Sequence, residues 1–538
     1  MDDAPLTPQR RPFSVKLWPP SEKTRHMLVE RMTRNLTQES IFTRKYGSLS
    51  QDEAWEHAKL IEEEAFLSVR QHYEKEPDGD GGAAVQLYAK ECSKLILEVL
   101  KKGPQTKDAE RQISDDVEVA RELFFDISKG QRAFIEAEEA DEIFKPLKDL
   151  GNAFTKICFS NRSFGLGAAR MVEPILVAMK SQLKEVDLSD FIAGRPEDEA
   201  LEVMTIFSAA LEGSALRYLN LSDNALGEKG VRAFGALLQS QSQLEELYLM
   251  NDGISEEAAH AVSELIPSTE KLKIIHFHNN MTGDEGALAI ADIVKRSVSL
   301  EDFRCSSTRI GSDGGVALSE ALGGCPNLRK LDLRDNMFGV EAGVALSKAL
   351  SKHVNLTELY LSYLNLENKG AIVIANVLKE STPSLQVLDM AGNDITVEAA
   401  PHLSACIASK QHLTKLNLSE NELKDEGAIL IAKALEEGQS HLEEVDFSSN
   451  LIRRAGARTL AQAVAKKPGF KLLNINGNFI SEDGIDDVKE IFKKCPEVLA
   501  SLEDNDPEGG DGEESGEEEG EGENGELESK LKNLEVGK

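Results

Sequence analysis

The chain repeats one short pattern through its central two-thirds: an apolar residue, any residue, an apolar residue, and then polar residues. Successive triplets begin 28 or 29 residues apart, except for one interval of 33 residues after the second triplet. A copy this short cannot bury its own apolar face, so neighbouring copies must stack to form a continuous core. The triplets begin at Ile157, Val186, Leu219, Leu247, Ile275, Phe303, Leu331, Leu359, Leu388, Leu416, Val445 and Leu473.

One copy shows what each part of the repeat does. Leu331 and Leu333 alternate with polar residues, as in a short strand with one buried face. Asn336 follows where the chain must turn, and a buried amide there can hydrogen-bond free backbone groups. Residues 340–350 then place apolar side chains at helical spacing. The pattern predicts an α/β leucine-rich-repeat solenoid, a horseshoe of about twelve repeats with a parallel inner sheet.

Two neighbouring positions in each copy differ in character. The ladder position holds asparagine in seven of the twelve copies: Asn224, Asn280, Asn336, Asn393, Asn421, Asn450 and Asn478. The rim position directly before it varies: Asn161, Asp190, Asp223, Asn251, Asn279, Ser307, Asp335, Tyr363, Gly392, Glu420, Ser449 and Gly477. Nothing in the repeat pattern requires one residue type there, so we interpret the rim position as free to contact a partner. Polar and acidic residues crowd its first seven members, which indicates a binding face in the N-terminal half, although a solvated rim has similar composition.

The remainder of the chain separates into segments by composition. Before the repeats, three helices are predicted over 21–36, from a capping box at Ser50 to about Tyr73, and over 83–100. After them comes a glycine-interleaved acidic stretch that cannot bury a core. We predict a polar leader at 1–13, a small helical domain at 14–103, a linker at 104–119, an N-terminal cap at 120–155, repeats at 156–497 and a disordered acidic tail at 498–538.

Composition narrows the chemistry. The net charge of −33 makes nucleic acid an unsuitable partner, because phosphates need lysine and arginine. The six cysteines form no C-x-x-C pair, and His276 and His278 are interpreted as solvent-facing strand residues, so we expect no metal site. No phosphate-binding glycine loop is present, so we expect no nucleotide or other cofactor. No apolar stretch approaches the roughly 20 residues that span a bilayer, so we expect no direct membrane insertion.

Two local features remain open to more than one interpretation. The 33-residue interval adds about five residues within 190–199, and insertions in repeat proteins often map to the binding face. Trp18, Pro19 and Pro20 are consistent with a helix start, with the tryptophan packed into the small core. They are also consistent with a rigid aromatic element that docks onto another helix.

Taken together, these motifs resemble those of plant Ran GTPase-activating proteins over nearly the whole chain. The N-terminal part is similar to the WPP domain through Lys16-Leu-Trp-Pro-Pro20, Arg31-Met-Thr-Arg-Asn35 and Ile41-Phe-Thr-Arg-Lys-Tyr-Gly47. The repeats are similar to the catalytic solenoid of that family through Leu221-Ser-Asp-Asn-Ala225, Leu247-Tyr-Leu-Met-Asn251 and Leu331-Asp-Leu-Arg-Asp335. A WPP domain joined to such a solenoid is a specific combination, whereas other proteins carry either half alone.

The resemblance implies a mechanism and a set of site residues. Members of the family are understood to activate Ran by holding Ran's own glutamine with a polar solenoid residue, without an arginine finger. By motif, Asn251 matches that residue and Asp335 a second functional position. The interface with Ran-GTP is then expected to include Arg195, Asn224, Asp223 and Asn279, although Asn224 also occupies the ladder position and can act through folding. The family lysine after the arginine has no counterpart here, because Pro196 and Glu197 follow.

The resemblance also implies a subcellular localisation. The WPP domain is expected to bind coiled-coil proteins of the nuclear envelope through Trp18, Pro19 and Pro20. The protein would then reside in the cytoplasm and at the outer nuclear envelope, and at the spindle, phragmoplast and cell plate during division. Two alternatives compete with activation of Ran: a WPP-anchored scaffold that stimulates no GTPase, and a ligand-sensing repeat protein, which the lack of a preceding nucleotide-binding domain disfavours.

Overall fold

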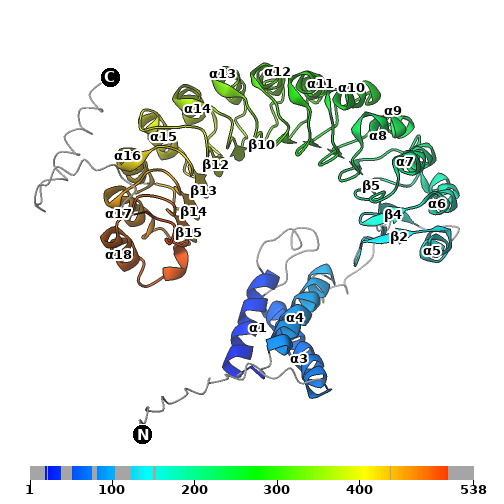
Figure 1. Ribbon diagram of the computed structural model, residues 1–538, viewed down its shortest axis with the longest axis horizontal. Helices are drawn as coiled ribbons and strands as arrows, with labels where there is room; N and C mark the ends of the chain where they lie inside the picture. Colours follow the sequence, from blue (N-terminus) through cyan, green and yellow to red (C-terminus); the bar gives the residue numbers. More distant parts are fainter. Residues whose placement is uncertain are drawn as a thin grey trace, which may run out of the picture. The chain divides into compact units, whose positions relative to one another are not determined.

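The chain divides into two compact units, Met1–Val119 and Ala120–Lys538, and each is described by itself (Figure 1). The computed structural model describes residues 19–20, 22–37, 51–75, 82–102, 123–130, 132–148, 153–436 and 438–506. Within these ranges, no helix combines the length and the apolar character needed to cross a membrane.

The first unit is built from three helices, α1 (Glu22–Thr37), α3 (Gln51–Lys75) and α4 (Gly82–Lys102). They lie within two residues of the three predicted helices. Small and apolar side chains at helical spacing form the core, because each helix buries one stripe and leaves a polar face outside. The core includes Met32 and Leu36 of α1, Ala58 and Ile61 of α3, and Tyr88 of α4.

One buried carboxylate joins all three helices of this unit. Glu62 of α3 is 5% exposed and accepts hydrogen bonds from Nε and Nη2 of Arg25 in α1 at 2.6 and 2.8 Å. The hydroxyl of Tyr88 in α4 donates to the same carboxylate. Arg25 also lies 3.7 Å from the centre of the Phe66 ring. Because the two charges are paired and further hydrogen-bonded, their removal from water is compensated.

The second unit is a solenoid whose thirteen parallel strands follow one another in chain order within a single sheet. The predicted triplets lie in register across it: Leu331 pairs with Phe303 on one side and with Leu359 on the other. The leucine-rich-repeat prediction is therefore confirmed. The strands are β1 (Leu123–Asp126), β3 (Phe154–Cys158), β5 (Glu185–Asp187), β6 (Tyr218–Asn220), β7 (Glu246–Tyr248), β8 (Ile274–His276), β9 (Asp302–Arg304), β10 (Lys330–Asp332), β11 (Glu358–Tyr360), β12 (Val387–Asp389), β13 (Lys415–Asn417), β14 (Glu444–Asp446) and β15 (Leu472–Asn474).

Helices cover the outer side of this arc, and the strands line its inner side (Figure 1). Each helix packs on the helix of the next repeat, so the solenoid curves with the sheet on the short side. The helices are α6 (Leu166–Met179), α7 (Glu197–Leu211), α8 (Gly227–Ala233), α9 (Gly235–Gln239), α10 (Glu256–Leu265), α11 (Gly283–Arg296), α12 (Ser312–Leu322), α13 (Gly339–Leu350), α14 (Glu367–Ser381), α15 (Ala400–Ala408), α16 (Lys424–Glu436), α17 (Arg454–Val464) and α18 (Glu482–Ile491).

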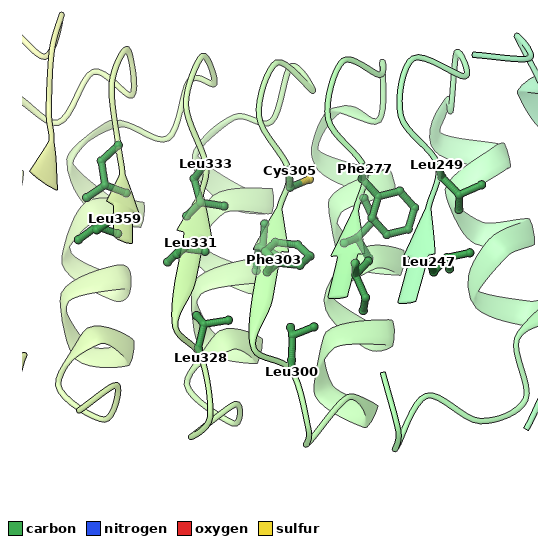
Figure 2. Packing of buried hydrophobic residues seen from close by; sticks show 14 of the residues in the cluster. Leu247, Leu249, Phe277, Leu300, Phe303, Cys305, Leu328, Leu331, Leu333 and Leu359 are labelled. Atoms are coloured by element: carbon green, nitrogen blue, oxygen red, sulfur yellow. The ribbon is translucent and has the colours of Figure 1, made fainter. Parts of the chain in front are cut away.

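The core between sheet and helices is a set of stacked apolar rows (Figure 2). Leu328, Leu331 and Leu333 of one repeat are each 0% exposed and lie beside their equivalents in the neighbouring repeats. Full burial of one such side chain contributes roughly 1.5–3 kcal/mol. The period of the sequence thus stabilises the stack as a whole, since every row is shared between neighbours.

The predicted asparagine ladder bridges each repeat to the previous one. In the repeat of β10, Nδ2 of Asn336 donates to the carbonyls of Leu333 at 2.8 Å and Cys305 at 2.9 Å. Its Oδ1 accepts from the backbone N–H groups of Thr308 and Ile310 at 3.2 and 3.0 Å. The buried amide satisfies backbone groups that the turn leaves free, as the sequence predicted.

A second set of buried polar contacts, at the helix C-termini, was not predicted. Nε2 of His353 lies 3.0 Å from the carbonyl oxygen of Leu322, where α12 ends, and Nε2 of Gln439 donates to Ile407 in α15 at 2.7 Å. Lys410, 1% exposed, donates to the carbonyl of Leu378 in α14. These residues satisfy carbonyls at the ends of neighbouring helices. Because a histidine, a glutamine and a lysine fill this one role, no repeated residue type in the sequence indicates it.

Both ends of the solenoid extend further than the repeat pattern indicates. At the N-terminal end, the predicted cap contributes strands β1 and β2 (Ala133–Ile135) and helix α5 (Ala137–Ile143), and β2 pairs with β4 (Arg162–Phe164) of the first repeat. At the C-terminal end, Asn505 accepts from the backbone of Asn478 at 2.9 Å, as a ladder asparagine does. The predicted start of the tail at residue 498 is therefore too early, because residues 498–506 continue the repeat geometry. Residues 507–538 lie outside the described ranges.

Candidate functional site

All twelve rim positions share one backbone conformation. Their φ angles lie between 50° and 65°, in the left-handed region, from Asn161 to Gly477. Asparagine, aspartate and glycine are the residues that tolerate this conformation best. The assumption that the backbone imposes no requirement at the rim position is therefore wrong. Asparagine or aspartate there has a structural reason, and only its side-chain surroundings can distinguish a binding residue.

Those surroundings single out three consecutive rim residues. Nδ2 of Asn279 donates to Oδ1 of Asn251 at 2.9 Å, and Nδ2 of Asn251 donates to Oδ1 of Asp223 at 2.8 Å. All three residues are exposed. The two neighbours hold the Asn251 amide in one orientation while leaving it one N–H and one acceptor lone pair. A group that is both oriented and unsaturated is suited to positioning another amide.

These residues border a shallow groove of about 590 Å³ at the edge of the sheet. The groove brings together three of the predicted site residues, Asn251, Asn279 and Asp335. Asp223 does not line it but is bonded to Asn251. We call it the rim groove, and its lining comprises Asn251, Gly253, Asn279, Asn280, Met281, Ser307, Arg309, Asp335, Asn336 and Met337. Sequence reasoning missed Met281, Arg309 and Met337, because they lie two positions after the rim position.

Beneath the groove, one ladder position carries a carboxyl group in place of an amide. Asp252 is 0% exposed, and its Oδ1 accepts from the backbone of Asn224 at 2.9 Å. Its Oδ2 has no hydrogen-bond partner among the described residues. Burial, reinforced by the negative charge of Asp223, raises the pKa of Asp252 well above its usual range. A neutral acid can replace a ladder asparagine because its O–H can donate where an amide N–H would.

Asn224, predicted at the interface, belongs to the framework of the solenoid. It is 2% exposed, and its Nδ2 donates to the carbonyls of Leu188 at 2.8 Å and Leu221 at 2.7 Å. Its Oδ1 accepts from the backbone of Phe191 at 3.0 Å. The structure thus corrects the assignment of Asn224 as a contact residue: replacing this amide would act through folding.

Arg195, also predicted at the interface, clamps the inserted loop to the N-terminal cap. Its side chain is only 9% exposed, and Nη1 lies 2.6 Å from Oε1 of Glu136. Nη2 donates to the carbonyl of Ser163 at 2.8 Å, and the guanidinium lies 4.9 Å from the centre of the Phe134 ring. These contacts occupy the guanidinium, so a structural role is sufficient to explain an arginine at this position. A direct contact of Arg195 with a partner stays a prediction.

On the inner face, aromatic side chains of three neighbouring strands lie side by side. The rings of Tyr218 and Tyr248 lie 5.2 Å apart, and Tyr248 lies 4.9 Å from the ring of His276. His276 is 8% exposed, so it is not the solvent-facing residue that alternation predicted; its neighbours and Asp302, 3.1 Å away, cover it. The carbonyl of His278 accepts from the backbone N–H of Asn251 at 3.1 Å. Burial lowers the pKa of His278.

The predicted targeting residues lie at the border of the described ranges. Trp18 lies outside them. Pro19 is exposed and Pro20 is half-buried just before α1. Both the packing of Trp18 into the small core and its docking onto another helix stay predictions.

Comparison with known proteins agrees with this two-part organisation. Residues 14–110 match the WPP domain family, and residues 215–235, 324–347, 382–400 and 409–432 match a leucine-rich-repeat family. RAN GTPase-activating protein 2 of Arabidopsis thaliana is 75% identical over 498 residues, which cover 92% of this chain and 91% of the relative. RAN GTPase-activating protein 1 of the same plant is 64% identical over 511 residues, with coverage of 95% and 94%. WPP domain-containing protein 2 of Arabidopsis thaliana is 42% identical over 89 residues, 16% of this chain and 48% of the relative.

Proposed function

This chain belongs to the family of plant Ran GTPase-activating proteins, and from that membership we propose that it stimulates the conversion of Ran-GTP to Ran-GDP. It acts in trans, as an activator that lends side chains to the GTPase and is not itself the enzyme. The observation that carries the proposal is the rim groove, in which Asn251, Asn279 and Asp335 line one surface.

The proposed chemistry centres on Asn251. GTPases of this kind hydrolyse GTP slowly until a glutamine positions the attacking water, and many activators add an arginine to stabilise transition-state charge. We propose that Asn251 instead holds Ran's own glutamine. Its remaining N–H and lone pair can form a complementary pair with a second amide. Because that pairing is most favourable when the water is aligned, it stabilises the transition state more than the ground state.

Asp335 is proposed to contribute mainly to binding. Its carboxylate is exposed in the rim groove and suits a basic patch on Ran. Asp223 orients Asn251 through their hydrogen bond and adds a second negative charge on the same side. In a chain of net charge −33, such acids also favour encounter with a basic partner surface, an effect that salt screens.

We propose that the first unit targets the protein to its place in the cell. Its WPP family match supports binding to coiled-coil proteins of the nuclear envelope through Trp18, Pro19 and Pro20. The activator would then act in the cytoplasm and at the outer nuclear envelope in support of nucleocytoplasmic transport, and at the spindle, phragmoplast and cell plate during division. Trp18→Ala with Pro19→Ala should disperse the protein without lowering activation. Unfolding of the three-helix unit in that variant would place Trp18 in the core instead.

Single-turnover GTP hydrolysis by purified Ran tests the activating function. We expect the full chain, and residues 120–506 alone, to accelerate hydrolysis well above the intrinsic rate of Ran. A folded chain that leaves this rate unchanged would contradict activation and favour a WPP-anchored scaffold. Circular dichroism provides the folding control.

A further inference from the structure

Arg309 is an exposed cation in the middle of the rim groove. It lies two residues after the rim residue Ser307, in the repeat between those of Asn279 and Asp335. Among the described residues, no carboxylate lies within salt-bridge distance of its guanidinium. Some other exposed arginines of the solenoid are paired, for example Arg232 with Glu228 at 2.8 Å, but Arg309 is the arginine that lines the rim groove. The chain has 94 acidic residues against 61 basic ones, so an unpaired arginine at this place calls for an explanation.

The backbone gives no reason for an arginine here. Arg309 has φ 61°, in the left-handed region, where a Cβ atom is unfavourable. Six repeats place a left-handed residue at this position, and glycine, asparagine and aspartate fill three of them. The six residues are Ala225, Gly253, Arg309, Asn365, Asp394 and Leu451. Asparagine or glycine would suit the turn better than arginine does.

The neighbours of Arg309 complete a recognition surface. Met281 and Met337 occupy the equivalent positions in the two adjacent repeats and are 48% and 57% exposed. Thioether side chains are flexible and adapt to an irregular apolar surface. They border the cation on both sides, so a partner covering them would also remove water from the guanidinium and strengthen any ion pair it makes.

We propose that Arg309 is a specificity-determining contact that binds a carboxylate on the surface of Ran-GTP, with Met281 and Met337 covering the apolar surface around that carboxylate. This inference rests on the proposed function. The charges along this edge alternate, with Asp223 negative, Arg309 positive and Asp335 negative. An alternating row pairs favourably with its complement in only one register, so it sets how the partner is aligned over Asn251.

A carboxylate, and not a nucleotide phosphate, is the ligand that this arrangement favours. Phosphate groups avoid surfaces lined by carboxylates, and Asp335 shares the groove with Arg309. A carboxylate on the partner, flanked by the basic residues that Asp223 and Asp335 attract, matches the whole row. Arg309 therefore contributes to affinity and register, and the chemical step does not depend on it.

The test compares Arg309→Ala with Arg458→Ala in the full chain, using purified Ran-GTP. Arg458 is exposed on α17, outside the rim groove. Its replacement by alanine changes the net charge by the same amount as Arg309→Ala. We expect Arg309→Ala to raise the activator concentration for half-maximal stimulation roughly five- to tenfold, as for loss of a charge-assisted hydrogen bond. In Arg309→Ala, the saturated hydrolysis rate should be unchanged and the association should depend less on salt. Arg309→Lys should partly restore the wild-type half-maximal concentration. Arg458→Ala should match the wild type.

Two results would overturn the inference. Half-maximal concentrations that are equal for Arg309→Ala and Arg458→Ala would show that no partner group contacts the cation. A lower saturated rate with unchanged half-maximal concentration would place Arg309 at the transferring phosphate. Arg309→Gly controls for folding, because it relieves the left-handed backbone and should melt no lower than the wild type. Failure of the wild-type chain to stimulate Ran would instead defeat the proposed function itself, and this inference with it.

Discussion

The rim positions of the N-terminal and C-terminal halves share one backbone conformation but differ in the contacts of their side chains. In the N-terminal half, Asp223, Asn251 and Asn279 form an exposed chain that leaves polar atoms of Asn251 available. In the C-terminal half, the hydroxyl of Tyr363 donates to Glu420 at 2.6 Å, which raises the pKa of Tyr363 to about 12. The Tyr363 ring also covers Gly392, where an added Cβ would lie 2.2 Å from Cδ1 of the ring.

This contrast separates fold from function within one repeat. The left-handed conformation occurs in both halves, so it carries no information about binding. The C-terminal row satisfies its own polar atoms across Tyr363, Gly392 and Glu420, whereas the N-terminal row borders an open groove. Function is therefore expected where side chains remain unsatisfied, so a substitution at the N-terminal rim positions should affect activation more than a matched substitution in the C-terminal half.

The largest effect is expected for Asn251→Ala. Loss of the positioning amide should lower the saturated rate of Ran hydrolysis by a factor on the order of 10²–10³, with little change in binding. Ser449→Ala is the matched control, because it also places alanine at a left-handed rim position, with φ 52° against 57°. Stopped-flow hydrolysis at saturating activator measures both. Near-normal turnover by a folded Asn251→Ala protein would refute the role of Asn251.

Exchanging an acid and an amide at the ladder position should have opposite effects on stability in the two halves, and both effects should depend on pH. Asp252→Asn should stabilise the protein at neutral pH by roughly 1–3 kcal/mol, because an amide donates at this buried position without the free-energy cost of keeping a carboxyl group protonated above its unfolded-state pKa. The raised native pKa of Asp252 means that its contribution is complete below the unfolded value near 3.9 and is lost as pH rises through the native pKa. The advantage of Asp252→Asn should therefore grow with pH.

Asn421→Asp in the C-terminal half provides the reciprocal control. Asn421 makes the full set of ladder bonds, including one from the backbone of Asn393 to its Oδ1 at 3.1 Å. We expect this variant to lose stability as pH rises, as the wild type does at Asp252. Denaturant unfolding followed by circular dichroism at pH values from about 4.5 to about 8, which all lie above the unfolded-state pKa of about 3.9, measures the differences. A pH-independent advantage of Asp252→Asn would refute the neutral carboxyl group.

A smaller effect is expected for Asp335→Ala. Removing its carboxylate should raise the half-maximal activator concentration roughly three- to tenfold and leave the saturated rate within about twofold, since an exposed charge contributes mainly to association. Glu420→Ala removes the same charge from a rim residue whose φ of 51° is close to the 55° of Asp335. Titrations at low and high salt distinguish the two. Equal shifts in both variants would indicate a nonspecific effect of net charge.

The smallest effect is expected for Tyr363→Asn. Asparagine relieves the left-handed backbone, while the hydrogen bond to Glu420 and the ring contact with Gly392 are lost, so stability should change by less than about 1 kcal/mol. Activation of Ran should be unaffected. Gly392→Ala should destabilise the wild type more than the Tyr363→Asn background, because the ring is then absent. Reduced activation by Tyr363→Asn would extend the binding surface into the C-terminal half.

Periodicity alone determined most of the solenoid. The first residue of each triplet, such as Leu331, lies in a strand of the sheet and the third, such as Leu333, follows that strand directly, because only one stacking register buries every apolar side chain. Asn336 and its equivalents occupy the ladder because the turn leaves backbone groups that a buried amide can satisfy. These features are local and recur in every copy, so one sequence is sufficient to predict them.

Tertiary structure decided what lies between the copies. The orientation of the Asn251 amide, the burial of Asn224 and the contacts of Arg195 depend on groups 28 to 60 residues away. The capping contacts of His353 and Lys410 share a role without sharing chemistry, so no sequence pattern marks them. The rim groove exists because stacking brings residues of successive repeats side by side, which the sequence separates by a full period. Where each side chain finds its partners is a property of the folded stack, because those partners belong to other copies.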